Sequence, residues 1–155
     1  MRIYTTGTVN AMGRAEDAVE RFSSGLNCSQ AVLGAFAEEY GLDVELALKV
    51  ACGFGGGMGR TGGACGAVTG AIMVLGLAHT GPEPREPAAK VRVYGLVQSF
   101  LEQFAEQHGA TECRDLLGCD IGTVEGYQQA VGRGLFQSQC PQYVRDAVEI
   151  LEEML

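Results

Sequence analysis

The apolar residues of this chain recur at helical spacing along nearly its whole length. In the first such stretch, four of them fall at i, i+3, i+4 and i+7, the pattern of one buried helix face: Ala15, Ala18, Val19 and Phe22. Glycines, prolines and capping residues separate the later stretches. The later stretches predict further helices from Asn27 to Tyr40, from Asp43 toward Cys52, from Cys65 to about Ala78, from the break at 81–87 to about His108, from Thr111 to Leu117, from Thr123 to Val131, and from Pro141 to the C-terminus.

Several of these helix starts carry clear capping signals. Asn27 is followed three residues later by Gln30, an arrangement typical of a capping box. Thr111 is a capping residue two positions before a cysteine, and Pro141 suits the first helical position. Along the last helix we expect a buried stripe made of Val144, Val148, Leu151 and Leu155.

One segment interrupts the helical pattern. Between positions 53 and 66 the chain runs Gly-Phe-Gly-Gly-Gly-Met-Gly-Arg-Thr-Gly-Gly-Ala-Cys-Gly. This glycine density disfavours a regular helix and lets the backbone approach another group closely. The stretch from Cys65 to about Ala78 is then small or apolar on all sides, which predicts a helix at the centre of a bundle.

These elements predict an all-α fold, a single compact domain of about six to seven helices over residues 1–155 with the glycine-rich loop before the buried central helix. The proline-rich break at 81–87 is short and helical on both sides, so we expect a loop there and not a domain boundary. We expect the N-terminal segment 1–13 to be loosely ordered, although Ile3, Tyr4 and Val9 also suit a strand.

Composition and charge narrow the function classes. Hydrophobic residues make up 46% of 155 residues, which is enough to bury a core. The net charge of −8 and the lack of a basic patch argue against nucleic acid as a partner, because phosphate binding needs clustered Lys and Arg. No apolar stretch reaches the roughly 20 residues that a membrane-spanning helix needs, and no signal peptide is evident. We therefore expect cytoplasmic localisation without membrane insertion.

The six cysteines carry the main chemical signal. In a reducing cytoplasm, cysteines act more often as metal ligands, catalytic groups or core residues than as disulfides. Four of them stand at predicted helix starts: Cys28, Cys65, Cys113 and Cys140. Free backbone N–H groups and the positive end of the helix dipole favour thiolate there, the form that attacks disulfides and binds metals. This shared placement predicts a redox or metal site.

Among single residues, Cys65 is the sharpest candidate. It has glycines before and after it, a helix start, and Arg60 nearby in sequence, and each feature favours a thiolate or access to it. Cys52 and Cys119 lie near predicted helix ends, where the dipole disfavours thiolate, so we treat them as secondary. Arg60 and Arg114 are candidates for contact with a negatively charged site or an anionic substrate.

The glycine-rich loop is a candidate for binding a cofactor through its backbone. Together with Arg60, the expected cofactor-binding residues are Gly55, Gly56, Gly57, Gly59, Gly63 and Gly66. A glycine-rich loop before a helix is also typical of phosphate sites. Here no Lys-Ser/Thr follows the glycines and no βαβ pattern surrounds them, so we expect no nucleotide.

Four thiolates are what an iron–sulfur cluster or an all-cysteine zinc site requires. Structural zinc modules usually take their ligands in close pairs. In this chain no C-x-x-C pair occurs, and the four candidate cysteines are far apart in sequence. An iron–sulfur cluster or a relay of thiols is therefore favoured over zinc.

At these residues the chain resembles a family of redox-active proteins named for their C-GCAxxG-C-C cysteine pattern. The matching pieces are Asn27-Cys28-Ser29-Gln30-Ala31-Val32, residues 53–60 of the glycine-rich loop, Cys65-Gly66-Ala67-Val68-Thr69-Gly70, Cys113-Arg114-Asp115-Leu116-Leu117-Gly118 and Cys140-Pro141. The piece around Cys65 differs from the sequence pattern that the family name spells, because Ala64 precedes the cysteine and Gly66 separates it from Ala67. The resemblance extends from about Ala15 to the C-terminus.

The resemblance implies that the signature cysteines are the same four that stand at helix starts, with Cys52 and Cys119 outside the signature. The family is similar to the non-haem part of split-Soret cytochromes, which carry an iron–sulfur cluster. Membership would therefore imply a redox function and strengthens the expectation of a cluster. Haem is not implied, because the chain has no C-x-x-C-H.

We therefore expect a redox protein in which Cys28, Cys65, Cys113 and Cys140 ligate an iron–sulfur cluster for electron transfer. Two alternatives stay open. One is an enzyme, a thiol–disulfide oxidoreductase with Cys65 as the nucleophile. The other is a non-enzymatic module in which zinc on the four cysteines holds the helices together. The sequence leaves open the redox partner and whether the chain forms a homo-oligomer.

Overall fold

The structure, a computed structural model, describes residues 12–155. Seven of its helices have eight or more residues: α1 (Arg14–Ser23), α2 (Cys28–Ala37), α3 (Val44–Ala51), α5 (Gly66–His79), α6 (Pro87–His108), α8 (Val124–Gly132) and α10 (Cys140–Met154). Three shorter ones are α4 (Gly55–Met58), α7 (Cys113–Leu117) and α9 (Leu135–Ser138). Across these described residues the only β pairing is an isolated bridge between Ala64 and Glu112. The prediction of an all-α bundle is confirmed.

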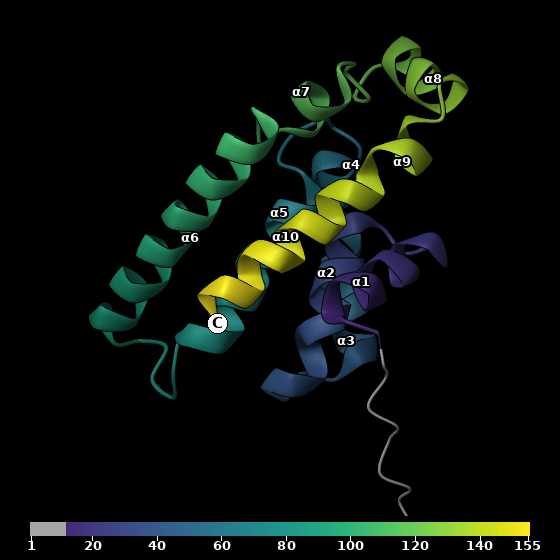
Figure 1. Ribbon diagram of the computed structural model, residues 1–155. Coiled ribbons are helices and arrows are strands. Elements are labelled where there is room, and N and C mark those ends of the chain that lie inside the picture. The colour runs from purple at the N-terminus through teal and green to yellow at the C-terminus, as the bar shows by residue number, and fades with distance from the viewer. Residues whose placement is uncertain (1–11) are drawn as a thin grey trace, which may run out of the picture.

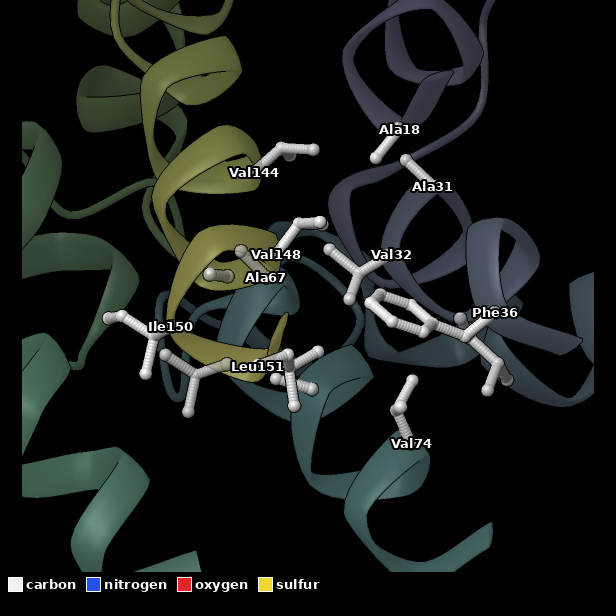
Figure 2. Packing of buried hydrophobic residues seen from close by; sticks show 14 of the residues in the cluster. Ala18, Ala31, Val32, Phe36, Ala67, Val74, Val144, Val148, Ile150 and Leu151 are labelled. Atoms are coloured by element: carbon white, nitrogen blue, oxygen red, sulfur yellow. The ribbon is translucent and has the colours of Figure 1, made fainter. Parts of the chain in front are cut away.

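The core lies where α10 crosses the middle of the bundle (Figure 1). The α10 helix packs against α1, α2, α5 and α6, and α2 also packs closely on α5. Figure 2 shows fully buried side chains from four helices meeting there: Ala18, Ala31, Val32, Phe36, Ala67, Val74, Val144, Val148 and Leu151. The predicted central helix is α5, and its small, apolar sequence suits it to contacts on several sides.

Glycines allow α2 and α5 to lie very close together. A Cβ atom on Gly70 would lie 2.9 Å from the carbonyl oxygen of Ser29 and 3.0 Å from the Cβ of Val32. One turn earlier, a Cβ on Gly66 would lie 3.0 Å from the Cβ of Cys28. Because no larger residue fits without moving backbone, this approach holds the start of α2 against the start of α5.

Capping residues set several helix starts as predicted. The amide nitrogen of Gln30 donates to Asn27 Oδ1, and the amide nitrogen of Asn27 donates to Gln30 Oε1, both at 2.9 Å, which completes the capping box. Asp43 caps α3 and Thr123 caps α8, each by accepting a backbone N–H. Gly109 ends α6 in the left-handed conformation.

Two helix boundaries differ from the predictions. The N-cap of α7 is Glu112 and not Thr111, because the Thr111 carbonyl accepts the N–H of Cys65 at 2.9 Å and joins α7 to the start of α5. The sequence pattern does not predict α9, because its four residues after the left-handed turn at Gly134 are too few to show helical periodicity.

The buried stripe of α10 ends earlier than predicted. Leu151 is fully buried, whereas Leu155 at the chain terminus is 40% exposed.

The predicted strand at Ile3, Tyr4 and Val9 lies outside the described residues, as does nearly all of the N-terminal segment. Within 12–155 no helix is both long enough and apolar enough to cross a membrane.

Candidate functional site

The four signature cysteines surround one cavity. It has a volume of about 660 Å³ and lies at the end of the bundle where α2, α5, α7 and α10 begin. Cys28, Cys113 and Cys140 are the first residues of their helices, and Cys65 is the N-cap of α5. In Figure 1 this end of the molecule carries the short helices α4, α7 and α9. Residues far apart in sequence thus meet at one place.

Hydrogen bonds to backbone carbonyl groups hold three of these helix starts in place. The N–H of Cys65 donates to Thr111 O, and the N–H of Cys113 donates to Gly63 O at 2.7 Å. The side chain of Asn27, next to Cys28, donates through Nδ2 to Cys52 O at 2.9 Å. These bonds tie α5 and α7 to the glycine-rich loop and α2 to the residue that precedes the loop, so the cysteine positions depend on the loop conformation.

The glycine-rich loop forms a left-handed turn along the cavity. Five consecutive residues, 56–60, have φ between +63° and +67°, and two of them are Met58 and Arg60. A non-glycine residue in this conformation costs about 1–2 kcal/mol. Hydrogen bonds hold the turn, including Arg60 N to Gly55 O at 3.2 Å and Gly63 N to Gly57 O at 2.8 Å.

Gly57 shows why part of this loop must be glycine. A Cβ atom there would lie 2.6 Å from Gly63 O and 2.7 Å from the Cβ of Cys113. The backbone of the loop therefore packs directly on a signature cysteine. Of the predicted cofactor-binding residues, those that line the cavity are Gly55, Gly56, Gly57, Gly59, Arg60 and Gly66.

The other predicted residues lie around the cavity in different ways. Gly63 does not line it and acts through hydrogen bonds to Gly57 and Cys113. Arg114 also lies outside the lining, and its Nε donates to Gly62 O at 3.0 Å. Cys119 is buried in an apolar cluster with Cys113 and Cys140.

Cys52 differs from the other cysteines by its exposure. It lines the cavity, but it is exposed to solvent, whereas Cys65, Cys113 and Cys140 are buried. Cys28 has intermediate exposure, and all six cysteines are free thiols. Cys52 therefore stands at the cavity rim and not among the thiols of its interior.

Burial changes the acidity expected for these thiols. It raises the pKa of Cys65 to about 11, although the backbone N–H groups of Ala67 and Val68 act in the opposite direction. Burial also raises the pKa of Cys113, to about 12, and the neighbouring Cys65 adds to the shift. The expectation that a helix start lowers the pKa is wrong for these two cysteines, because the lost hydration of the charged form outweighs the helix-start amides.

Cys28 and Cys140 form a directly interacting pair. The interaction between the two thiols lowers the pKa of Cys140 and raises the pKa of Cys28 well above its ordinary value. Desolvation and the neighbouring Cys65 add to the rise at Cys28. Among the four signature thiols, Cys140 is the one whose pKa is lowered.

The rest of the cavity wall is mostly apolar, and sequence reasoning missed its aromatic part. Tyr127, Phe136 and Tyr143 line the cavity. Tyr143 could have been found, because it follows Cys140 by three positions and so lies on the same face of α10. Its hydroxyl donates to Leu116 O at 2.9 Å, which joins α10 to α7. Nothing local in the sequence marks Tyr127 or Phe136.

The donor set suits a thiolate-bound group. Four thiols from separate helices face one space, and apolar residues such as Leu117 and Ile121 line the same space. Such soft sulfur donors select iron–sulfur clusters, zinc or copper(I). Among residues 12–155, no three Cys, His, Asp or Glu side chains are placed to share a single metal ion.

Comparison with known proteins places the chain in a family. Residues 26–154 match the model of the family described as "Putative redox-active protein (C_GCAxxG_C_C)". No curated protein and no solved structure matches the chain. The family match includes all four signature cysteines and nearly the whole described chain. The chain therefore belongs to the C_GCAxxG_C_C family of redox-active proteins.

Proposed function

We propose that the protein transfers electrons through an iron–sulfur cluster held by Cys28, Cys65, Cys113 and Cys140. The observation that carries this proposal is that all four thiols line one cavity of about 660 Å³. Cysteine thiolates are the usual ligands of such clusters. The cavity also offers room for a group of several atoms and not only for one ion.

The surrounding residues suit a negatively charged, thiolate-bound group. The N-termini of α2, α5 and α10 all adjoin the cavity, so the positive ends of their dipoles favour anionic sulfur. Backbone N–H groups of Ala67 and Val68 already lie near the sulfur of Cys65. Hydrogen bonds to sulfur and the exclusion of water are the means by which a protein adjusts the potential of a cluster. When bound, the cluster would supply one-electron exchange.

A thiol–disulfide oxidoreductase is the second candidate, because Cys28 and Cys140 line the same cavity and interact closely enough to shift each other's pKa. The Cys140 thiolate would attack a substrate disulfide, forming a mixed disulfide and releasing one substrate thiolate, which takes up a proton. Cys28, after losing its proton, would attack the sulfur of Cys140 and release the second substrate thiol. The protein dithiol is thereby oxidised and the substrate disulfide reduced. In this candidate the attacking role falls on Cys140 and not on Cys65, since burial raises the pKa of Cys65 to about 11.

The zinc alternative requires a rearrangement. The four thiols would have to close around a single ion, and within residues 12–155 no three suitable side chains now have that spacing. Zinc binding would then be coupled to a movement of the helix starts.

Metal analysis under exclusion of oxygen tests these candidates. We would purify the wild type, Cys65→Ser and Cys119→Ser without oxygen, record visible spectra, and assay iron, acid-labile sulfide and zinc. Cys119 provides the matched control, because it is buried like Cys65 but does not line the cavity. Iron with sulfide and broad visible absorption in the wild type and Cys119→Ser, lost in Cys65→Ser, would support the cluster. Zinc alone would favour the structural module, and a metal-free protein with a reversible Cys28–Cys140 disulfide would favour the oxidoreductase.

A further inference from the structure

The rim of the cavity carries one isolated positive charge. Among the residues that line the cavity, Arg60 is the only Asp, Glu, Lys, Arg or His. Arg60 is exposed, whereas the thiols of Cys65, Cys113 and Cys140 are buried. The whole chain has a net charge of −8, so this cation contrasts with the rest of the protein. The entrance to the thiols is thus electrostatically suited to an anion.

The guanidinium of Arg60 is held in place but is not neutralised. Its Cζ lies 4.2 Å from the centre of the Tyr127 ring, which fixes one face of the guanidinium plane. In the part of the chain that the structure describes, Arg60 forms no ion pair, and its side chain donates no hydrogen bond. The N–H groups around the edge of the plane stay available, in a geometry that matches a carboxylate or sulfonate.

The backbone of Arg60 supports a role beyond packing. Its φ of +66° is unfavourable for any residue with a side chain, and glycine would adopt it without strain. Neighbouring positions 56, 57 and 59 of the same turn are glycines. A strained non-glycine residue at a cavity rim is typical of functional sites, where strain is retained for the sake of a side chain.

Aromatic rings lie next to this cation. Tyr127 and Phe136 both line the cavity, and their ring centroids are 5.9 Å apart. We propose that Arg60, Tyr127 and Phe136 form a binding subsite for a small organic anion with a flat apolar body. The anionic group would pair with the edge of the Arg60 guanidinium, and the apolar body would lie against the aromatic rings. This subsite goes beyond the proposed cluster and depends only on the rim, so it holds whichever group the thiols bind.

Binding of 2-naphthalenesulfonate tests the subsite. We would titrate it by calorimetry, at low ionic strength, into the full chain purified without oxygen. Two analogues separate the contributions: 2-naphthalenesulfonamide keeps the flat body without the charge, and methanesulfonate keeps the charge without the body. We expect saturable binding of 2-naphthalenesulfonate, weaker binding of both analogues, and weaker binding at high salt, because the charge of Arg60 is exposed.

Variants assign the binding to Arg60. Arg60→Gln should weaken the binding of 2-naphthalenesulfonate about tenfold or more, which is the scale of one lost charge-assisted hydrogen bond. Arg133→Gln removes the same charge from an exposed arginine of the α8 end that does not line the cavity, and should leave the affinity unchanged. Arg60→Lys should give an intermediate affinity, since lysine keeps the charge but lacks the planar fork.

Several outcomes would overturn the subsite. These are absence of binding to the wild type, equal affinities of Arg60→Gln and Arg133→Gln, or equal affinities of the sulfonate and the sulfonamide. Circular dichroism of each variant, together with Arg60→Lys, separates loss of the subsite from loss of the fold. Iron and sulfide are assayed on the same samples, so failure of the cluster proposal is seen independently of naphthalenesulfonate binding.

Discussion

The contact between α2 and α5 can be tested at Gly70. Replacing Gly70 by alanine would put a Cβ atom 2.9 Å from the carbonyl oxygen of Ser29 and 3.0 Å from the Cβ of Val32. Real Cβ atoms essentially never lie closer than 3.0 Å to such atoms. The oxygen belongs to the backbone of a buried helix, so the contact can be relieved only if α2 and α5 move apart.

The expected loss of stability follows from two opposing effects. Overpacking in a filled core costs about 1–3 kcal/mol. Alanine also has a higher helix propensity than glycine, by about 1 kcal/mol in a helix interior. For Gly70→Ala we therefore expect a net decrease of up to about 2 kcal/mol in the free energy of unfolding.

Gly76→Ala provides the matched control. Gly76 lies in the same helix, and a Cβ atom there would meet nothing within 4 Å. Only the propensity gain applies, so we expect this variant to be more stable than the wild type by about 0.5–1 kcal/mol. The same glycine-to-alanine substitution should thus change the free energy of unfolding in opposite directions at two positions six residues apart in α5.

Urea unfolding of the reduced, metal-free protein, followed by circular dichroism, measures both variants against the wild type. If Gly70→Ala were as stable as Gly76→Ala, the close contact of the two helices would not limit the fold and the reasoning would be refuted. We also expect Gly70→Ala to retain less iron after anaerobic purification, because separating α2 from α5 moves Cys28 away from Cys65.

Three further predictions concern the loop and the thiols. Because the pKa of Cys65 is raised, the folded metal-free protein keeps a proton that the unfolded chain loses, so the free energy of unfolding should fall as the pH rises from about 9 toward 11. The urea midpoint measured against pH should therefore fall less steeply across that range in Cys65→Ala than in the wild type. Met58→Gly should raise the free energy of unfolding by up to about 1 kcal/mol, since it removes left-handed strain at a side chain that is 45% exposed, and an unchanged or lower urea midpoint would contradict this. Gly57→Ala should abolish iron and sulfide retention because its Cβ would press on Cys113, whereas Gly59→Ala, equally left-handed but 3.7 Å from its nearest neighbour, should retain more of both.

The fold class could be predicted because local signals agreed with the tertiary packing. The apolar spacing of α1, the capping box at Asn27 and the all-apolar sequence of α5 each point to the helix that forms. The helix α9 could not be predicted in this way, since its four residues are held by packing and turn geometry and show no period. The start of α7 also differed, because a hydrogen bond to the distant Cys65 uses the carbonyl of Thr111.

For the site, the choice of thiols follows from the sequence alone, since Cys28, Cys65, Cys113 and Cys140 all lie at helix starts that local capping, glycine and proline signals indicate. That these four starts share one cavity depends on the tertiary structure, because long-range hydrogen bonds and glycine contacts bring them together. The tertiary structure also decided the acidity of the thiols. A helix start is a local property that favours thiolate, but burial depends on the whole fold, and for Cys65 the loss of hydration is the larger effect.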